Sequence, residues 1–356
     1  MSRPHARRAG SLGLALVLGL GTAAETPELS AQEPGWMVTN VPHVDLWYHG
    51  MGVLGLQGSG PLSRYAPDYA SAIGQEKEEL GVTTRLDRER RRLRDGFASD
   101  NAFEFLHFLP LYFVAAGPTA MFEALRTVAR TSGAPDVADR MARSGAIATA
   151  YALPSERQRG LLLEFVDALE DEWEQFYSDH LRRNAARRRS ELSEKQAAWD
   201  SAFAVPLGGF LEAEKLSAGW ILVVPALGQD GRVFRGDPDN PRDNIVAVGE
   251  LAEHGLEGSL HAAVRELCFP LVSQALQAAQ VPLTDRVAGS RLSGRMAVRC
   301  GEMLLDRYAP ELTRAYRSTF AAGGSSDAEV SRAFASRYAL DPEVEKTLSE
   351  AVSAQP

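Results

Sequence analysis

Apolar residues recur every three or four positions through most of the chain between residues 40 and 200. This spacing places them on one face of a helix, so it predicts a series of amphipathic helices. The predicted helices are VDLWYHGMGVLGL (44–56), residues 68–80, NAFEFLHFLPLYF (101–113), PTAMFEALRTVART (118–131), APDVADRMARSG (134–145) and residues 155–199. Because no alternating pattern typical of strands occurs here, residues 25–205 are predicted to form a helical N-terminal region.

The pattern changes at Leu216. Three short apolar runs rich in β-branched residues follow, separated by turn residues: AGWILVVPAL (218–227), RVFRG (232–236) and DNIVAVGE (243–250). They predict a small antiparallel sheet of about three strands. Helical spacing then resumes over residues 257–279, 286–308, 311–320, 327–340 and 342–351. The predicted fold class is therefore mainly α with a small antiparallel β-sheet (α+β), and residues 206–356 form the second region.

Residues 1–24 have the pattern of a secretory signal peptide. Three arginines precede the nine-residue apolar run LGLALVLGL, and small residues follow it. Cleavage is expected after Ala24 or after Ala31, since both follow small residues. The run is about half the length needed to span a bilayer, and no later segment is long enough, so the mature chain is predicted to have no transmembrane segment. We therefore expect an exported bacterial protein, periplasmic or extracellular.

The charge of the chain argues against nucleic acid as a partner. Removal of residues 1–24 takes away Arg3, Arg7 and Arg8 and no acidic residue, so the formal net charge moves from −9 to −12. A surface with this excess of negative charge repels a phosphate backbone.

The segment VRELCF (264–269) has the frame of a zinc-binding helix, in which an apolar residue precedes His-Glu-x-x-His. Arg265 and Phe269 occupy the two histidine positions, and Glu266 occupies the position of the general base. A guanidinium stays protonated and a phenyl ring has no lone pair, so neither residue can bind zinc. Glu302 lies 33 residues after Phe269 in a predicted helix and has the spacing of a third metal ligand.

The order of the small sheet GWILVVPAL…NIVAVGE, the helix AAVRELCFPLV and the later GEMLL resembles the gluzincin type of zinc metallopeptidase, over residues 216–308. Pro270 falls on a proline of the secreted bacterial members. The resemblance implies a zincin-like C-terminal half in which Glu266 is a vestigial base. Two of the three ligands are missing, so it also implies an inactive enzyme without zinc or another cofactor.

An inactive relative of this kind is expected to bind peptide or protein in the former active-site cleft, through Arg265, Phe269 and Glu302. One alternative is a helical exported structural or interaction protein unrelated to peptidases. Another is an active metalloenzyme in which His254 and His261 join Glu302 in a displaced metal site.

Cys268 and Cys300 are the two cysteines of the chain. In an oxidising compartment two thiols tend to form a disulfide, and each has a single intramolecular partner. If helices 257–279 and 286–308 pack together, with Glu302 near Arg265, the two sulfurs should meet. The alternative is two independent buried thiols.

Other candidate sites are weaker. His43, His49 and His107 lie among aromatic residues at helical spacing, which is more typical of a core than of a groove. Asp45 and His49 are four residues apart and could form a hydrogen bond on one helix face. The chain has no Gly-x-Ser-x-Gly elbow, phosphate loop or dinucleotide fingerprint.

Overall fold

The structure is a computed structural model that describes residues 35–56, 62–131, 138–237, 240–251, 254–281, 285–321 and 326–356. The predicted signal peptide, residues 1–24, lies outside the described residues. Residues 34–356 form one compact unit, which contains residues 34–205 of the predicted N-terminal region together with the predicted region 206–356. Within the described residues, no helix is sufficiently long and apolar to cross a membrane.

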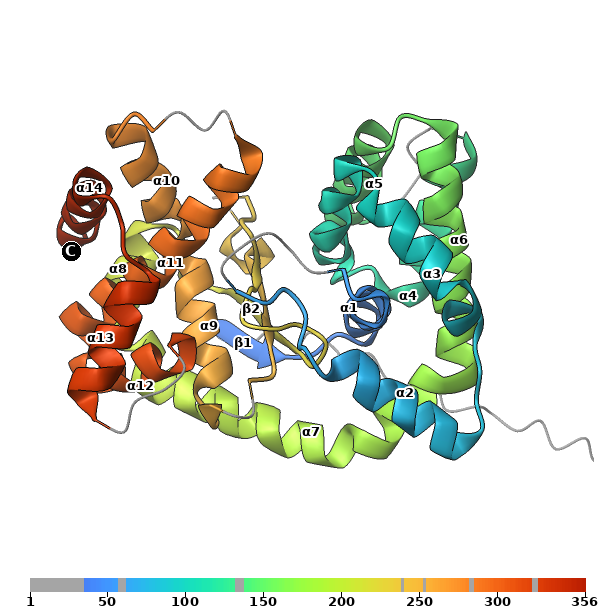
Figure 1. Cartoon of the computed structure of the whole chain (residues 1–356), viewed down its shortest axis with the longest axis horizontal. Coiled ribbons are helices and arrows are strands. Elements are labelled where there is room, and N and C mark those ends of the chain that lie inside the picture. Colours follow the sequence, from blue (N-terminus) through green and yellow to red (C-terminus); the bar gives the residue numbers. More distant parts are fainter. Residues whose placement is uncertain are drawn as a thin grey trace, which may run out of the picture. The chain divides into compact units, whose positions relative to one another are not determined.

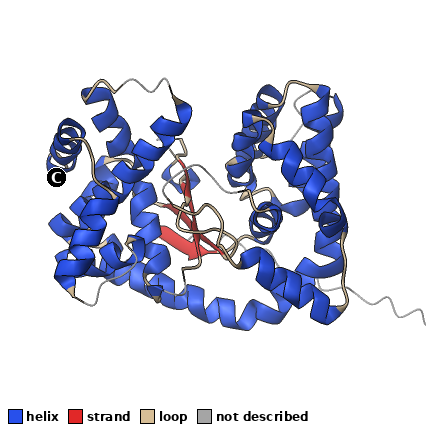
Figure 2. Ribbon diagram, in the orientation of Figure 1, coloured by secondary structure: helices blue, strands red, loops and turns tan. Residues whose placement is uncertain are grey.

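The protein is mostly helical, as predicted (Figures 1 and 2). The first group of α-helices is α1 (Pro42–Leu54), α2 (Tyr69–Leu80), α3 (Arg85–Ala98), α4 (Gly117–Thr131), α5 (Arg140–Ala152), α6 (Glu156–Glu172), α7 (Ser178–Ala198) and α8 (Gly208–Ala213). The second group is α9 (Gly258–Leu267), α10 (Phe269–Ala278), α11 (Arg286–Tyr308), α12 (Pro310–Phe320), α13 (Asp327–Arg337) and α14 (Pro342–Ser353). The segment 101–113 forms two 3₁₀ helices, Asn101–His107 and Leu109–Phe113, in place of the α-helix predicted there.

Four strands form one mixed sheet: β1 (Trp36–Thr39), β2 (Gly219–Val224), β3 (Arg232–Phe234) and β4 (Ile245–Gly249), in the order β1-β2-β4-β3. β1, β2 and β4 are parallel, and β3 is antiparallel to β4. The prediction of an antiparallel sheet was therefore wrong. Strands β2 and β4 are almost wholly buried, and their uninterrupted apolar sequences are typical of parallel strands. The prediction also missed β1, whose partner β2 lies far away along the chain.

Alternate side chains of a strand point to opposite faces of the sheet, and here both faces are buried. Ile221 and Val223 belong to one hydrophobic cluster with residues of α9–α14. Leu222 and Val224 belong to a second cluster with residues of α1 and α3–α6. The sheet therefore lies between two groups of helices, which Figure 1 shows in orange to red and in blue to green.

The helix predicted over residues 257–279 is divided into α9 and α10 at Cys268. Pro270 has no N–H to donate to the carbonyl of Glu266, so the regular helical hydrogen bonding is interrupted at this point. The division ends α9 directly after Arg265, Glu266 and Leu267.

Candidate functional site

Helix α9 packs against β4 and β3 and presents Arg265 and Glu266 to the edge of the sheet. Both side chains are buried, with exposed fractions of 2% for Arg265 and 1% for Glu266. Burial of charged groups is costly unless each is paired. The arrangement of their partners therefore decides what this part of the molecule can do.

Arg265 is held between two carboxylates. Its Nη2 donates to Oδ1 of Asp230 at 2.9 Å, and its Nη1 donates to Oε1 of Glu266. Asp230 lies in the turn between β2 and β3 and also accepts a hydrogen bond from Nη1 of Arg232 at 3.0 Å. These four residues, Arg265, Glu266, Asp230 and Arg232, are called the Arg265 cluster below.

The two carboxyl groups of the cluster have different acidities. Burial raises the pKa of Glu266 to about 7, against the lowering effect of Arg265. Burial also acts on Asp230, but Arg232 and Arg265 outweigh it and hold the pKa of Asp230 below its ordinary value. Near neutral pH, Asp230 is therefore ionised while Glu266 is near its midpoint of titration.

Gly231 allows Glu266 to approach the sheet. The backbone N–H of Gly231 counters part of the rise that burial causes in the pKa of Glu266. A Cβ at this position would lie 2.9 Å from Cγ of Glu266 and 2.8 Å from the carbonyl oxygen of Ala247. Any side chain larger than hydrogen would therefore push Glu266 or β4 away.

The polar network extends from the cluster towards the first group of helices. The guanidinium of Arg232 lies 5.4 Å from the ring centroid of Phe108. Nη1 of Arg64 donates to Nε2 of His107 at 2.7 Å, and because arginine can only donate, Nδ1 carries the ring proton. That proton is donated to the hydroxyl of Tyr65 at 2.6 Å. Burial, together with Arg64 and Arg232, lowers the pKa of His107 well below its ordinary value, so the ring is neutral.

The structure does not bring Glu302 to Arg265. Glu302 accepts hydrogen bonds from Arg299, one turn earlier on α11, and from Nε of Arg317 on α12 at 2.6 Å. The expected pairing of Glu302 with Arg265 was therefore wrong, because α12 supplies a closer cation. Phe269, by contrast, does lie beside the cluster, with its ring centroid 5.7 Å from the guanidinium carbon of Arg265.

The predicted packing of helix 286–308 against helix 257–279 is confirmed, since α11 contacts both α9 and α10. Cys268 and Cys300 are buried in the same hydrophobic cluster, and the Cys300 thiol acts on Cys268 and raises its pKa. Both are free thiols in the structure, so the expected disulfide is not formed there.

The histidines proposed for a displaced metal site have other partners. Nδ1 of His261 lies 2.8 Å from Oγ1 of Thr319 on α12, inside the core. Burial lowers the pKa of His261 to about 4. Among the residues that the structure describes, no three His, Cys, Asp or Glu side chains are grouped so that they could hold a metal ion.

A second buried ionic network was missed by the sequence analysis. Nζ of Lys77 contacts both carboxylate oxygens of Asp87, at 2.9 and 2.8 Å, and Oε2 of Glu172 at 2.8 Å. Glu172 also accepts from Nε2 of His49 at 2.8 Å, and Nδ1 of His49 lies 2.8 Å from the hydroxyl of Tyr69. The sequence contained a signal for this network, because Lys77 of α2 and Glu172 of α6 lie on helix faces whose other buried residues are apolar.

The expected Asp45–His49 hydrogen bond is not formed, because Asp45 contacts Asn40 and Arg188 instead. His43, His49 and His107 are buried, as predicted for core residues.

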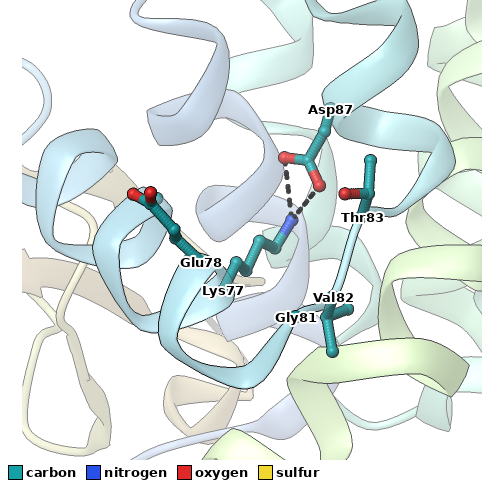
Figure 3. Close-up of a pocket in the computed structure, with 7 residues that line it drawn as sticks. Lys77, Glu78, Gly81, Val82, Thr83 and Asp87 are labelled. Carbon is teal, nitrogen blue, oxygen red and sulfur yellow. Dashed lines mark hydrogen bonds and ion pairs between the residues drawn. The ribbon is translucent and has the colours of Figure 1, made fainter.

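A cavity of about 400 Å³ adjoins the Lys77 network, between α2 and α3. Figure 3 shows the Lys77 amine pointing to Asp87, with Thr83 nearby and Glu78 directed away. The amine is already bound by carboxylates on two sides, so the polar contacts here are satisfied within the protein. This network stabilises the packing of α1, α2, α3 and α6, and the Arg265 cluster remains the candidate site.

Comparisons of the chain with models of protein families, with curated protein sequences and with solved structures found no match.

Proposed function

We propose that the protein is an exported, catalytically inactive relative of zinc metallopeptidases that binds peptide or protein beside its former active site. The observation that carries the proposal is the Arg265 cluster. Glu266 stands at the position of the general base, and the guanidinium groups of Arg265 and Arg232 place two positive charges beside Glu266 and Asp230. A divalent cation would supply the same charge to a pair of carboxylates.

The cluster itself is closed to a ligand. Arg265 is already paired with two carboxylates, so its charge is not available to a bound peptide, although binding through Arg265 was expected from the sequence. The ligand is therefore expected to lie at the surface of the cluster. Phe269 is partly exposed there, Phe108 is exposed, and the Asp230 side chain is partly accessible.

Strand β3 gives this surface a backbone that suits an extended peptide. It is the last strand in the order β1-β2-β4-β3 and pairs with β4 along one side. An added peptide strand would hydrogen-bond to such an edge, and neighbouring side chains would provide selectivity.

The closure of the cluster favours a second candidate function, that of a helical exported interaction protein unrelated to peptidases. In that case the buried ion pairs hold α9 against the turn between β2 and β3, and β3 has no ligand.

The first experiment tests the metallopeptidase frame. Elemental analysis of the mature protein after dialysis is expected to show no stoichiometric zinc. The double change Arg265→His and Phe269→His places imidazoles on one face across the α9–α10 junction, and we expect it to create micromolar zinc binding, measured by calorimetry. One zinc ion per wild-type chain, or a folded double variant that binds none, would contradict the proposal.

The second experiment tests peptide binding with a fluorescein-labelled tryptic digest of casein, followed by fluorescence anisotropy. Binding should slow hydrogen exchange of the Arg232–Phe234 amides, and Phe269→Ala should weaken it. Tyr151→Ala is the matched control, since Tyr151 is 89% exposed on α5 and belongs to a different helix. No binding, or equal effects of the two alanine variants, favours the interaction protein.

A further inference from the structure

Cys268 and Cys300 come from different parts of the chain and lie in the same core cluster. Cys268 is the residue between α9 and α10, and Cys300 lies in the middle of α11. Both are fully buried and belong to the same hydrophobic cluster. Because α11 packs against both α9 and α10, the two cysteines lie in the same part of the core, where the Cys300 thiol is close enough to act on the pKa of Cys268.

The surroundings of the pair determine when it can react. Burial and the neighbouring Cys300 thiol raise the pKa of Cys268 well above its ordinary value. The attacking species in disulfide chemistry is the thiolate, so the folded, reduced protein should react slowly. Oxidation is therefore expected during folding, when both thiols are still accessible to solvent.

We propose that Cys268 and Cys300 form a disulfide in the exported protein, closed during folding by exchange with a small-molecule or protein disulfide. The thiolate of one cysteine attacks the partner disulfide, forms a mixed disulfide and releases one partner thiol. The thiolate of the second cysteine attacks the mixed disulfide and releases the other partner thiol. The two cysteines together lose two protons and two electrons, and the partner disulfide is reduced to two thiols.

The bond would fix the end of α9 to α11. Arg265 and Glu266 lie within one turn of Cys268, so the bond would also restrain the helix end that carries the Arg265 cluster. This inference rests on the export stated in the proposed function, but it does not depend on peptide binding or on the likeness to peptidases.

The geometry is tested by refolding the denatured, reduced mature chain with oxidised glutathione, and in parallel with reduced glutathione only. Each product is quenched with acid, denatured, treated with N-ethylmaleimide and weighed by mass spectrometry. The oxidised sample is expected to be two hydrogens lighter and to carry no alkyl group. Its melting temperature should exceed that of the reduced sample by on the order of 5–10 °C. Two alkyl groups, or a glutathione adduct on each cysteine, would overturn the proposal.

The variant Cys300→Ala is the matched control and should take up one alkyl group or one glutathione under every condition. If it fails to fold, the comparison of oxidised and reduced wild-type protein decides the question alone. The export premise is tested separately, on full-length protein isolated from the periplasm or medium of a bacterial host without reductant. The protein from the host could contain two free thiols although the refolded protein forms the disulfide. That result would overturn the export premise, and with it the proposal, but it would still show that the two cysteines can form the bond.

Discussion

At the scale of single residues, the charge and the pairing of Arg265 determine what the candidate site can bind. It is buried between Asp230 and Glu266 and donates a hydrogen bond to each, so its own buried charge is paired. A histidine in its place would be neutral near pH 7 and could bind metal, whereas the guanidinium excludes a metal cation by charge.

Replacement of Arg265 by methionine should strongly destabilise the protein, because it leaves the buried Glu266 without its main cation and leaves Asp230 with Arg232 alone. We expect a loss of about 3–5 kcal/mol in the free energy of unfolding, measured by urea denaturation. The control is Arg182→Met on the exposed surface of α7, which should change stability by less than about 0.5 kcal/mol. Similar small effects of both changes would show that the cluster is not formed as described.

The raised pKa of Glu266 predicts how stability changes with pH. The carboxyl group titrates at about 7 in the folded protein, where it faces Arg265, Asp230 and Arg232, and near 4.5 in the unfolded chain. Between these values the folded chain binds more protons than the unfolded chain, so this group lowers stability as the pH rises from about 4.5 to 7. The full loss remains above pH 7.

The substitution Glu266→Gln removes this dependence. Relative to the wild type, the free energy of unfolding of the variant should therefore rise by roughly 1–3 kcal/mol between pH 4.5 and 7. Burial raises the pKa of Asp45 to about 6, so Asp45→Asn should act over a lower range that ends near pH 6. Urea denaturation at a series of pH values distinguishes the two variants. If the free energies of unfolding of Glu266→Gln and the wild type changed equally with pH, the raised pKa of Glu266 would be refuted.

At the scale of elements, close contact between helices depends on glycines that the helical pattern does not mark. Gly301 lies in α11, where a Cβ would be 2.2 Å from the hydroxyl oxygen of Tyr316 on α12. That hydroxyl donates to the carbonyl of Val298 at 3.0 Å. The same close packing of α12 brings Arg317 to Glu302, which explains why Glu302 is not paired with Arg265.

Gly301→Ala should therefore destabilise the protein by about 1–3 kcal/mol, although alanine is the better helix former. Gly160 on α6 is the matched control, since a Cβ there would meet nothing within 4 Å. Gly160→Ala should stabilise the protein by roughly 0.5–1 kcal/mol. Thermal unfolding of both variants provides the measurement, and effects of the same sign would contradict the packing of α11 on α12.

At the scale of the whole molecule, a strand from the beginning of the described chain completes a sheet whose other strands lie between residues 219 and 249. β1 comes from the beginning of the described residues and pairs with β2, which follows eight α-helices. The sheet is covered on one face mainly by the later helices and on the other mainly by the earlier ones. The two groups of helices therefore depend on the same sheet, although the pattern of apolar residues along the chain changes at Leu216.

A fragment of residues 206–356 should consequently fail to fold by itself. It would lack β1 and would expose Leu222 and Val224, whose partners are in the first group of helices. Near-ultraviolet circular dichroism and thermal unfolding should show no fixed tertiary structure and no cooperative transition. The chain 34–356 is the control and should unfold in a single transition, whereas a cooperatively folded fragment would show that the sheet is not shared in this way.

The sequence by itself determined the mainly helical character and the strands β2, β3 and β4. These features follow from local periodicity, since residues a few positions apart must share a face. Tertiary structure decided the directions of the strands, the addition of β1 and the partners of the charged residues. Arg265 is bound to Asp230, 35 positions away, and Glu302 to Arg317 on another helix, because a buried charge takes whichever opposite charge the fold brings closest.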